Sequence, residues 1–211
     1  MDVLAQIAAQ LTAGDDERVS QLTREALAAG QAPKDVLNRG LLAGMAVVGE
    51  RFKCQEIYLP DVLLAAQAMN AGMALLKPLL AGADVPTLGK VVLGSVHGDL
   101  HDIGKNLVGV MLKGAGCEVI DLGNDIAPEQ FVDAAERHAA RVIGMSALLT
   151  TTMPVMGQVV ALVRQRGLAG RVRTIIGGAP VTERFAREIG ADAHGYDAVN
   201  AVERVKHLLA C

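Results

Sequence analysis

Gly94-Ser-Val-His-Gly-Asp-Leu-His-Asp-Ile-Gly-Lys-Asn106 joins an apolar run that starts at Lys90 to a helical pattern that starts at Leu107. A strand, a loop and a helix in this order form a place where open α/β sheets hold ligands. This loop carries two histidines and two aspartates, whereas a phosphate loop offers glycine amides and a lysine. The stretch therefore predicts a ligand other than a phosphate.

Short β-rich runs alternate with helical patterns from this stretch to the end of the chain. Strands are predicted at 91–96, 118–122, 142–147 and 172–176, with a weak fifth at 191–194, and helices at 103–114, 127–140, 154–166, 182–189 and 198–209. Strands that alternate with helices imply a parallel sheet with helices on both faces. Five such units predict a flavodoxin-like (Rossmann-like) five-stranded parallel sheet with strand order 2-1-3-4-5.

Strands one, three and four are neighbours in that order, so the loops that follow them should meet at one edge of the sheet. The second of these loops is Ser146-Ala-Leu-Leu-Thr-Thr-Thr152, and the third is Gly177-Gly-Ala-Pro180. The unusual residues of this half of the chain fall on these three loops. We therefore expect the functional site there.

The first 80 residues show helical patterns only. Apolar residues with helical spacing predict helices over 4–11, 19–27, 34–48 and from Pro60 to Pro78. Four helices with short connections predict a four-helix bundle, here called the cap. The domain prediction is a cap over 1–80, a linker over 81–89 and an α/β domain over 90–211.

The composition excludes several classes of protein. With 211 residues, a net charge of −3 and no run of Lys or Arg, the chain is not expected to bind nucleic acid. Its longest uncharged window, 142–163, contains polar residues and a proline, and the N-terminus shows no signal peptide, so we expect no membrane association and a cytoplasmic location. Three distant cysteines indicate neither a disulfide framework nor a cysteine-based zinc site.

Two other interpretations of the opening stretch fit its residues less well. Gly98 and Gly104 have five residues between them where a Walker loop needs four, and Asp99 and Asp102 would repel a polyphosphate. A mononuclear zinc or iron site could use His97, Asp99, His101 and Asp102, but no further Cys/His cluster completes the ligand set.

Asp99 and His101 have the spacing of a carboxylate and the imidazole that it orients. Such a carboxylate fixes the tautomer of a metal-ligating histidine and raises its basicity. Asp102 is expected to cap the following helix. Gly104 leaves room for a bulky group near the start of that helix.

Asp99-x-His101-x-x-Gly104 resembles the cobalamin-binding motif of methionine synthase and of the corrinoid proteins of methylotrophic methyltransferase systems (methylamine, methanol and betaine types). In that family Ser-x-Leu and Gly-Gly follow the motif. Here 41 residues separate Gly104 from Ser146, and 28 separate Leu148 from Gly177. The resemblance covers nearly the whole chain.

The resemblance implies a cobalamin (methylcobalamin or cob(I)alamin) bound base-off, with His101 as the lower axial ligand of cobalt. Its dimethylbenzimidazole tail would enter the sheet past Ser146 and Leu148 towards Gly177. Thr152 stands where the family has a relay hydroxyl. The expected cofactor-binding residues are Gly98, Asp99, Leu100, His101, Asp102, Ile103, Gly104, Ser146, Leu148, Thr150, Thr152, Gly177, Gly178 and His194.

The segment from Gly49 to Pro60 is similar to the part of the family's cap that shields the upper face of cobalamin. The resemblance implies that Phe52, Leu59 and Val62 cover the methyl group, with Met69 nearby. For Val62 and Met69, a place in the core of the bundle is an equal alternative.

The function that the resemblance implies is that of a non-catalytic methyl carrier. Its partners would be a substrate-specific methyltransferase, a second methyltransferase that accepts the methyl group, and a reductive activase. The alternatives are a cobalamin sensor or storage module and the small subunit of an adenosylcobalamin-dependent mutase. The sequence does not identify the methyl donor.

Overall fold

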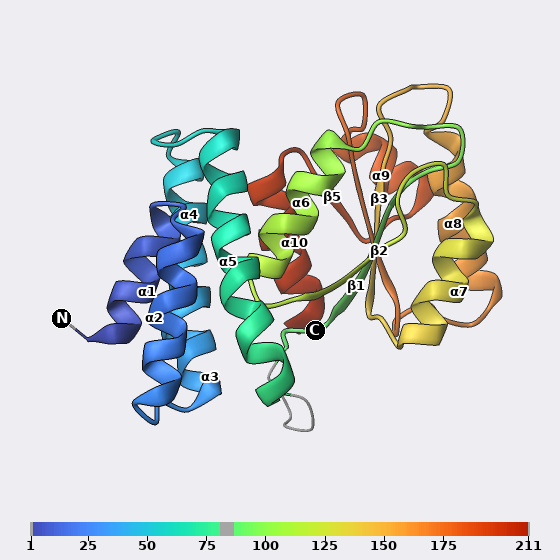
Figure 1. Cartoon of the computed structure of the whole chain (residues 1–211). Helices are drawn as coiled ribbons and strands as arrows, with labels where there is room; N and C mark the ends of the chain where they lie inside the picture. Colours follow the sequence, from blue (N-terminus) through green and yellow to red (C-terminus); the bar gives the residue numbers. More distant parts are fainter. Residues whose placement is uncertain (1, 81–86, 211) are drawn as a thin grey trace. The chain divides into compact units, whose positions relative to one another are not determined.

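The computed structural model describes residues 2–80 and 87–210. It divides into two compact units, Met1–Pro86 with Gly114–Gly116, and Thr87–Lys113 with Cys117–Cys211 (Figure 1). The predicted linker over 81–89 stays a prediction, because residues 81–86 lie outside the described residues.

The first unit is helical, as predicted. Its elements are α1 (Val3–Thr12), α2 (Asp16–Ala28), α3 (Pro33–Asp35), η1 (Val36–Leu42), α4 (Ala43–Lys53) and α5 (Leu59–Leu80). Side-chain carboxylates start the first two helices: Asp2 accepts a hydrogen bond from the Leu4 amide at 3.3 Å, and Asp15 from the Arg18 amide at 2.9 Å. These bonds pair amide groups that a helix leaves free at its N-terminus.

The predicted third helix, 34–48, is part of a longer helical run from Pro33 to Lys53. Its middle part, η1, is a π-helix, whose wider turns have i→i+5 hydrogen bonds. Gly40 lies on this part, and a Cβ there would be 3.1 Å from Ile7 Cγ2 of α1. The glycine therefore allows the close packing of these two helices.

Helix α5 extends two residues beyond its predicted end at Pro78. A proline this close to the end of a helix removes only one hydrogen bond near the last turn. By length and composition α5 could cross a membrane, but a core helix passes the same test, and eight of its residues are buried.

The second unit contains a five-stranded parallel sheet in the order β2-β1-β3-β4-β5, which confirms the predicted fold. The strands are β1 (Lys90–Ser95), β2 (Glu118–Asp121), β3 (Val142–Ser146), β4 (Arg173–Gly177) and β5 (Ala193–Gly195). Each lies within two residues of its predicted ends. The loops after β1, β3 and β4 meet at the carboxyl edge, at the top of Figure 1.

Helices cover both faces of the sheet (Figure 1). They are α6 (Ile103–Gly114), α7 (Pro128–His138), α8 (Pro154–Gln165), α9 (Glu183–Ile189) and α10 (Ala198–Ala210). Helices α6 and α10 lie on one face, and α7, α8 and α9 share a core with the other. Prolines at the first position of α7 and α8 suit the fixed φ of a helix start.

Phe131 on α7 is the largest fully buried side chain in the described residues. It packs against β1, where a Cβ on Gly94 would lie 2.8 Å from the ring. The glycine therefore makes the space that this ring fills, and the pair fixes α7 to the strand that ends at the opening stretch.

We expect Phe131→Ala to lower the free energy of unfolding by about 3–5 kcal/mol, because it removes buried apolar surface and leaves a cavity beside Gly94. Urea unfolding followed by circular dichroism would measure the loss. Phe185→Ala, which truncates a partly exposed ring on α9, should cost clearly less. Equal losses for the two variants would contradict this account of the core.

Candidate functional site

Asp99 joins two of the three loops at the carboxyl edge. Its side chain is fully buried. Oδ2 accepts hydrogen bonds from the amides of Leu148 (2.8 Å) and Leu149 (3.1 Å) and from Thr152 Oγ1 (2.8 Å). The loop after β1 is thus held to the loop after β3 by one carboxylate.

The other carboxylate oxygen organises the loop after β1 itself. Asp99 Oδ1 accepts the His101 amide at 3.1 Å and lies 2.8 Å from His101 Nδ1. Burial raises the pKa of Asp99, but the hydrogen bonds from His101, the Leu148 amide and Thr152 outweigh it and hold this pKa well below its usual range. The carboxylate is therefore ionised at neutral pH.

The His101 side chain is 53% exposed although its Nδ1 is held by Asp99. In the neutral imidazole, a carboxylate at that distance favours the tautomer with the proton on Nδ1, which leaves the lone pair on Nε2. An oriented imidazole with a free, accessible nitrogen is suited to bind a metal from outside the loop.

His97 has a different carboxylate partner. Its Nδ1 lies 2.8 Å from Asp125 Oδ1, which also accepts the Gly98 amide at 2.7 Å. That amide and His97 lower the pKa of Asp125. Within 2–80 and 87–210 no group of three or more His, Cys, Asp or Glu side chains could hold a metal ion. The zinc or iron interpretation therefore gains no support.

Three further residues of the opening stretch are Asp102, Gly98 and Gly104, and their surroundings differ. Asp102 directly precedes α6, and its carbonyl oxygen accepts the Asn106 amide at 2.7 Å. Its side chain has no hydrogen bond to the described residues, so the structure does not support the expected side-chain cap. Gly98 has a φ of +81°, and a Cβ there would lie 3.3 Å from Thr152 Cγ2. Gly98 thus accommodates the methyl group that distinguishes Thr152 from a serine, while around Gly104 the space is open.

Two residues that hold the site together, Ser95 and Leu149, were not predicted from the sequence. Ser95 is fully buried, and its hydroxyl donates to the carbonyl oxygen of His101 at 2.7 Å. Leu149 acts only through its backbone amide. A small polar residue at the end of the strand before the motif could have pointed to Ser95. The sequence holds no comparable signal for Leu149, because nothing in it shows that a backbone amide donates a hydrogen bond to a carboxylate fifty residues away.

Small residues cross the sheet at its carboxyl edge. In the observed register Ser95 pairs with Ser146, Ser146 with Gly177, and Gly177 with Gly195. A Cβ on Gly177 would lie 2.9 Å from the Gly195 carbonyl oxygen. Gly178 has a φ of +129°, and a Cβ there would collide with the Ala147 carbonyl oxygen. Both glycines are thus required by the close approach of the backbone.

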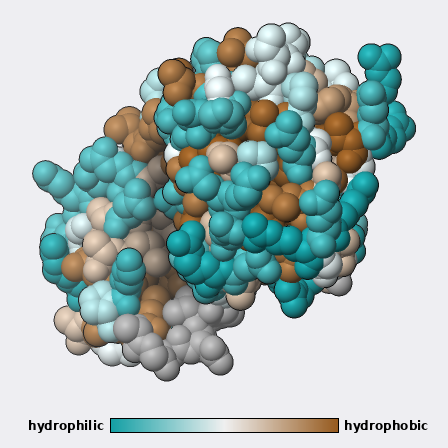
Figure 2. Space-filling model, turned by 90° about the vertical axis from the view of Figure 1, so that its right-hand side faces the viewer, coloured by the Kyte–Doolittle hydropathy of each residue, from teal (hydrophilic) through white to brown (hydrophobic). Residues whose placement is uncertain are grey.

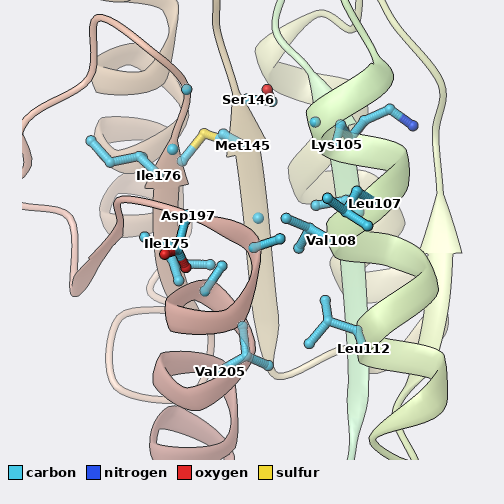
Figure 3. Close-up of a pocket in the computed structure, with 18 of the residues that line it drawn as sticks. Lys105, Leu107, Val108, Leu112, Met145, Ser146, Ile175, Ile176, Asp197 and Val205 are labelled. Atoms are coloured by element: carbon cyan, nitrogen blue, oxygen red, sulfur yellow. The ribbon is translucent and has the colours of Figure 1, made fainter. Parts of the chain in front are cut away.

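Beneath this row a cavity of about 340 Å³ lies between the sheet and helices α6 and α10 (Figure 3). Ser146, Gly177, Gly178 and Gly104 contribute to its lining, so three separate parts of the predicted motif set meet there. Most of the remaining lining is aliphatic. Its volume is within the range of cofactor sites.

His194 is not part of this lining. The side chain is mostly buried, and its Nδ1 lies 3.6 Å from Glu183 Oε2 at the start of α9. Side chains alternate between the two faces of a strand, and His194 lies on the face covered by α9. The structure therefore does not support its expected contact with a nucleotide tail.

The other predicted residues of these loops are exposed. Leu100 is 69% exposed, Ile103 76% and Leu148 44%, and Thr150 is also exposed. Figure 2 shows hydrophobic residues scattered among hydrophilic ones on the face that it draws. Leu100 and Ile103 lie within two residues of His101 in the chain, and exposed apolar side chains of this kind can contribute to a surface that binds an apolar partner.

The four predicted cap residues differ in exposure. Val62 is fully buried and Met69 is 6% exposed, so the structure places both in the core of the bundle. Phe52, at the end of α4, and Leu59, at the start of α5, are partly exposed. Only these two present side-chain surface to a ligand.

Comparisons with known proteins agree with this geometry. Family models described as B12 binding domains match residues 3–77 and 89–204. The chain is 41% identical to trimethylamine corrinoid protein 1 of Methanosarcina mazei, over 99% of this chain and 97% of that protein. It is 45% identical to the dimethylamine corrinoid protein of Methanosarcina barkeri, over 84% of each.

Among solved structures, the chain is similar to one in the methanol:cobalamin methyltransferase complex MtaBC from Methanosarcina barkeri. The TM-score is 0.92 and the sequence identity 30%, over 99% of this chain and 80% of that one.

The pKa of Asp99 leads to a prediction about acid unfolding. Its folded-state value lies below the value of about 3.9 in an unfolded chain. The stabilisation is therefore complete above that value and is lost as the pH falls through the folded-state pKa. Asp99→Asn should lower the free energy of unfolding by about 2–4 kcal/mol at pH 7, because several hydrogen bonds lose a charged acceptor.

Urea unfolding at pH 7 and at pH 3 would measure the effect, and the gap between the variant and the original protein should narrow at the lower pH. Asp35→Asn, at an exposed aspartate, serves as the control. A loss that does not depend on pH would contradict the role assigned to the charge.

Proposed function

Because this chain belongs to the B12-binding corrinoid proteins of methylamine and methanol methyltransferase systems, we propose that it carries a methyl group on cobalamin between two methyltransferases. The observation that carries the proposal is the His101 imidazole, whose Nδ1 is held by a buried carboxylate and whose side chain is 53% exposed. When bound, cobalamin supplies a cobalt atom that accepts and releases a methyl group.

The residues present fit this cofactor in three ways. His101 would offer a single ring nitrogen, Nε2, to the cobalt of a bound cobalamin, whose corrin ring would supply the other nitrogens. The exposed apolar side chains of Leu100, Ile103 and Leu148 offer a surface for the corrin ring. The cavity lined by Ser146 and Gly177 offers a place for the nucleotide tail once its base has left the metal.

In this proposal the protein controls the cofactor through His101. Asp99 holds the ring and raises its basicity, so the imidazole competes with the cofactor's own base for cobalt. Thr152 and two backbone amides hold Asp99 in place. All of these side-chain hydrogen bonds to Asp99 come from loops that follow strands of the sheet, so the sheet positions their donors.

We propose that the helical unit supplies the cover for the upper face, through Phe52 and Leu59. Their partial exposure supports this assignment, and the burial of Val62 and Met69 makes those two structural supports. The cover must open for either partner enzyme to reach the cofactor, which is a gating step of the kind that lids perform. A reductive activase is a third expected partner.

His101 ligation can be tested directly. Protein containing ¹⁵N-labelled histidine, loaded with cobalamin and reduced to Co(II), should show a doublet superhyperfine pattern in EPR, whereas unlabelled protein should show a triplet. The reason is that ¹⁵N has spin one half and ¹⁴N has spin one. The isotope effect separates a histidine from the cofactor's own base.

In His101→Ala the isotope-sensitive splitting should vanish, while in His97→Ala it should remain. A triplet that persists in labelled protein would mean that the cofactor's own base is on the metal, and the proposed base-off binding would be wrong.

Methyl transfer is the test of the carrier role. The names of the relatives favour a methylated amine as donor. We expect the reconstituted, reduced protein to change its absorption spectrum when trimethylamine or dimethylamine and the methyltransferase from its own organism are added together. Methanol and its methyltransferase form the comparison. A protein that binds cobalamin but turns over no donor would indicate a sensor or storage module.

A further inference from the structure

We infer that the cavity between α6 and α10 makes this protein selective for the lower base of its cofactor, so that it takes an apolar benzimidazole in preference to a purine. The inference rests on the proposed function, since it assumes that the displaced base enters this cavity. It specifies the chemical class of the lower base, which the proposed function leaves open.

The inner end of the cavity is aliphatic. Val91 on β1, Leu112 on α6 and Val205 on α10 line it, with 0%, 0% and 1% of their surface exposed. Figure 3 places Leu112 and Val205 at the end away from Ser146, and Val108 and Ile175 between them. A base that reaches this end contacts methyl and methylene groups.

Four lining side chains are polar, Lys105, Ser146, Tyr196 and Asp197, and Tyr196 is 73% exposed at the surface. Lys105 Nζ is bonded to both oxygens of Asp121 (2.6 and 2.8 Å), and Figure 3 shows its side chain directed away from the cavity. Asp197 Oδ1 accepts the Asn200 amide at 2.7 Å. Ser146 lies at the opposite end (Figure 3).

At the inner end, the backbone groups of the described lining residues already have partners. The parallel ladders β1–β3 and β3–β4 pair these strands along the cavity floor. Leu112 lies in the last turn of α6, where its carbonyl oxygen accepts the Cys117 amide at 3.0 Å, and Val205 lies in the interior of α10, where backbone groups are bonded within the helix. A polar base edge at the inner end would thus lose its bonds to water and gain none.

The lack of polar partners at the inner end affects two common lower bases differently. The 5,6-dimethylbenzimidazole ring carries methyl groups on its outer edge, whereas adenine carries an amino group and ring nitrogens. A buried polar group without a partner weakens binding by roughly tenfold or more. A site without polar partners therefore discriminates against the purine, through the cost of removing it from water.

The test is a competition between two cobamides that differ only in their lower base, 5,6-dimethylbenzimidazole or adenine. Both are reduced to Co(I), in which neither free cofactor has its base on the metal. The difference in binding therefore measures how well each base fits the cavity. The full-length apoprotein is mixed anaerobically with an equal excess of both, separated by gel filtration, and its bound cobamides are measured by chromatography. We expect the benzimidazole form to be bound in about tenfold excess or more.

A single hydroxyl in the cavity should weaken the selectivity. Val205→Thr keeps the volume of the side chain and adds a polar partner, and we expect the ratio to fall about threefold or more. Val163→Thr is the matched control: Val163 is also buried, 3% exposed, but lies in the core on the other face of the sheet. It should leave the ratio unchanged.

The outcomes separate this inference from the proposed function. Equal binding of both cobamides, or a preference for adenine, would overturn the selectivity and leave the carrier role intact. Retention of neither cobamide would overturn both. A ratio that falls equally in the two threonine variants would show that the selectivity does not come from this cavity.

Discussion

The site depends on one buried carboxylate. Asp99 is fully enclosed, and an ionised group in that position is stable only because His101, Thr152 and two backbone amides donate hydrogen bonds to it. The same bonds connect the loops after β1 and β3 and orient the imidazole. Removing the charge would therefore affect the fold of the edge and the chemistry of the site together.

The strand order makes this arrangement possible. Because β1 lies beside β3 and β3 beside β4, the loops that follow these strands leave the sheet at adjacent points. The small residues Ser95, Ser146 and Gly177 stand side by side in the register and leave space beneath the loops. Bulkier residues in this row would close the mouth of the cavity.

The two histidines of the opening stretch show how neighbouring residues of the same type are separated by the fold. His101 faces a buried aspartate in its own loop, whereas His97 pairs with Asp125 from the loop after β2. The two imidazole rings are thus oriented by different carboxylates, each through its Nδ1. His97 and His101 are four residues apart in the chain, and this spacing did not predict that they have different carboxylate partners.

The sequence by itself determined the helical and α/β halves, the order of strands and the three loops, because periodicity and turn residues act over short distances. It also indicated the Asp99 and His101 pair, which are two residues apart. Only the tertiary structure decided the contacts over about fifty residues that bury Asp99, the hydroxyl of Ser95 on His101, and the face on which His194 lies. It also decided that Val62 and Met69 are core residues, because burial depends on packing against distant helices that no local pattern encodes.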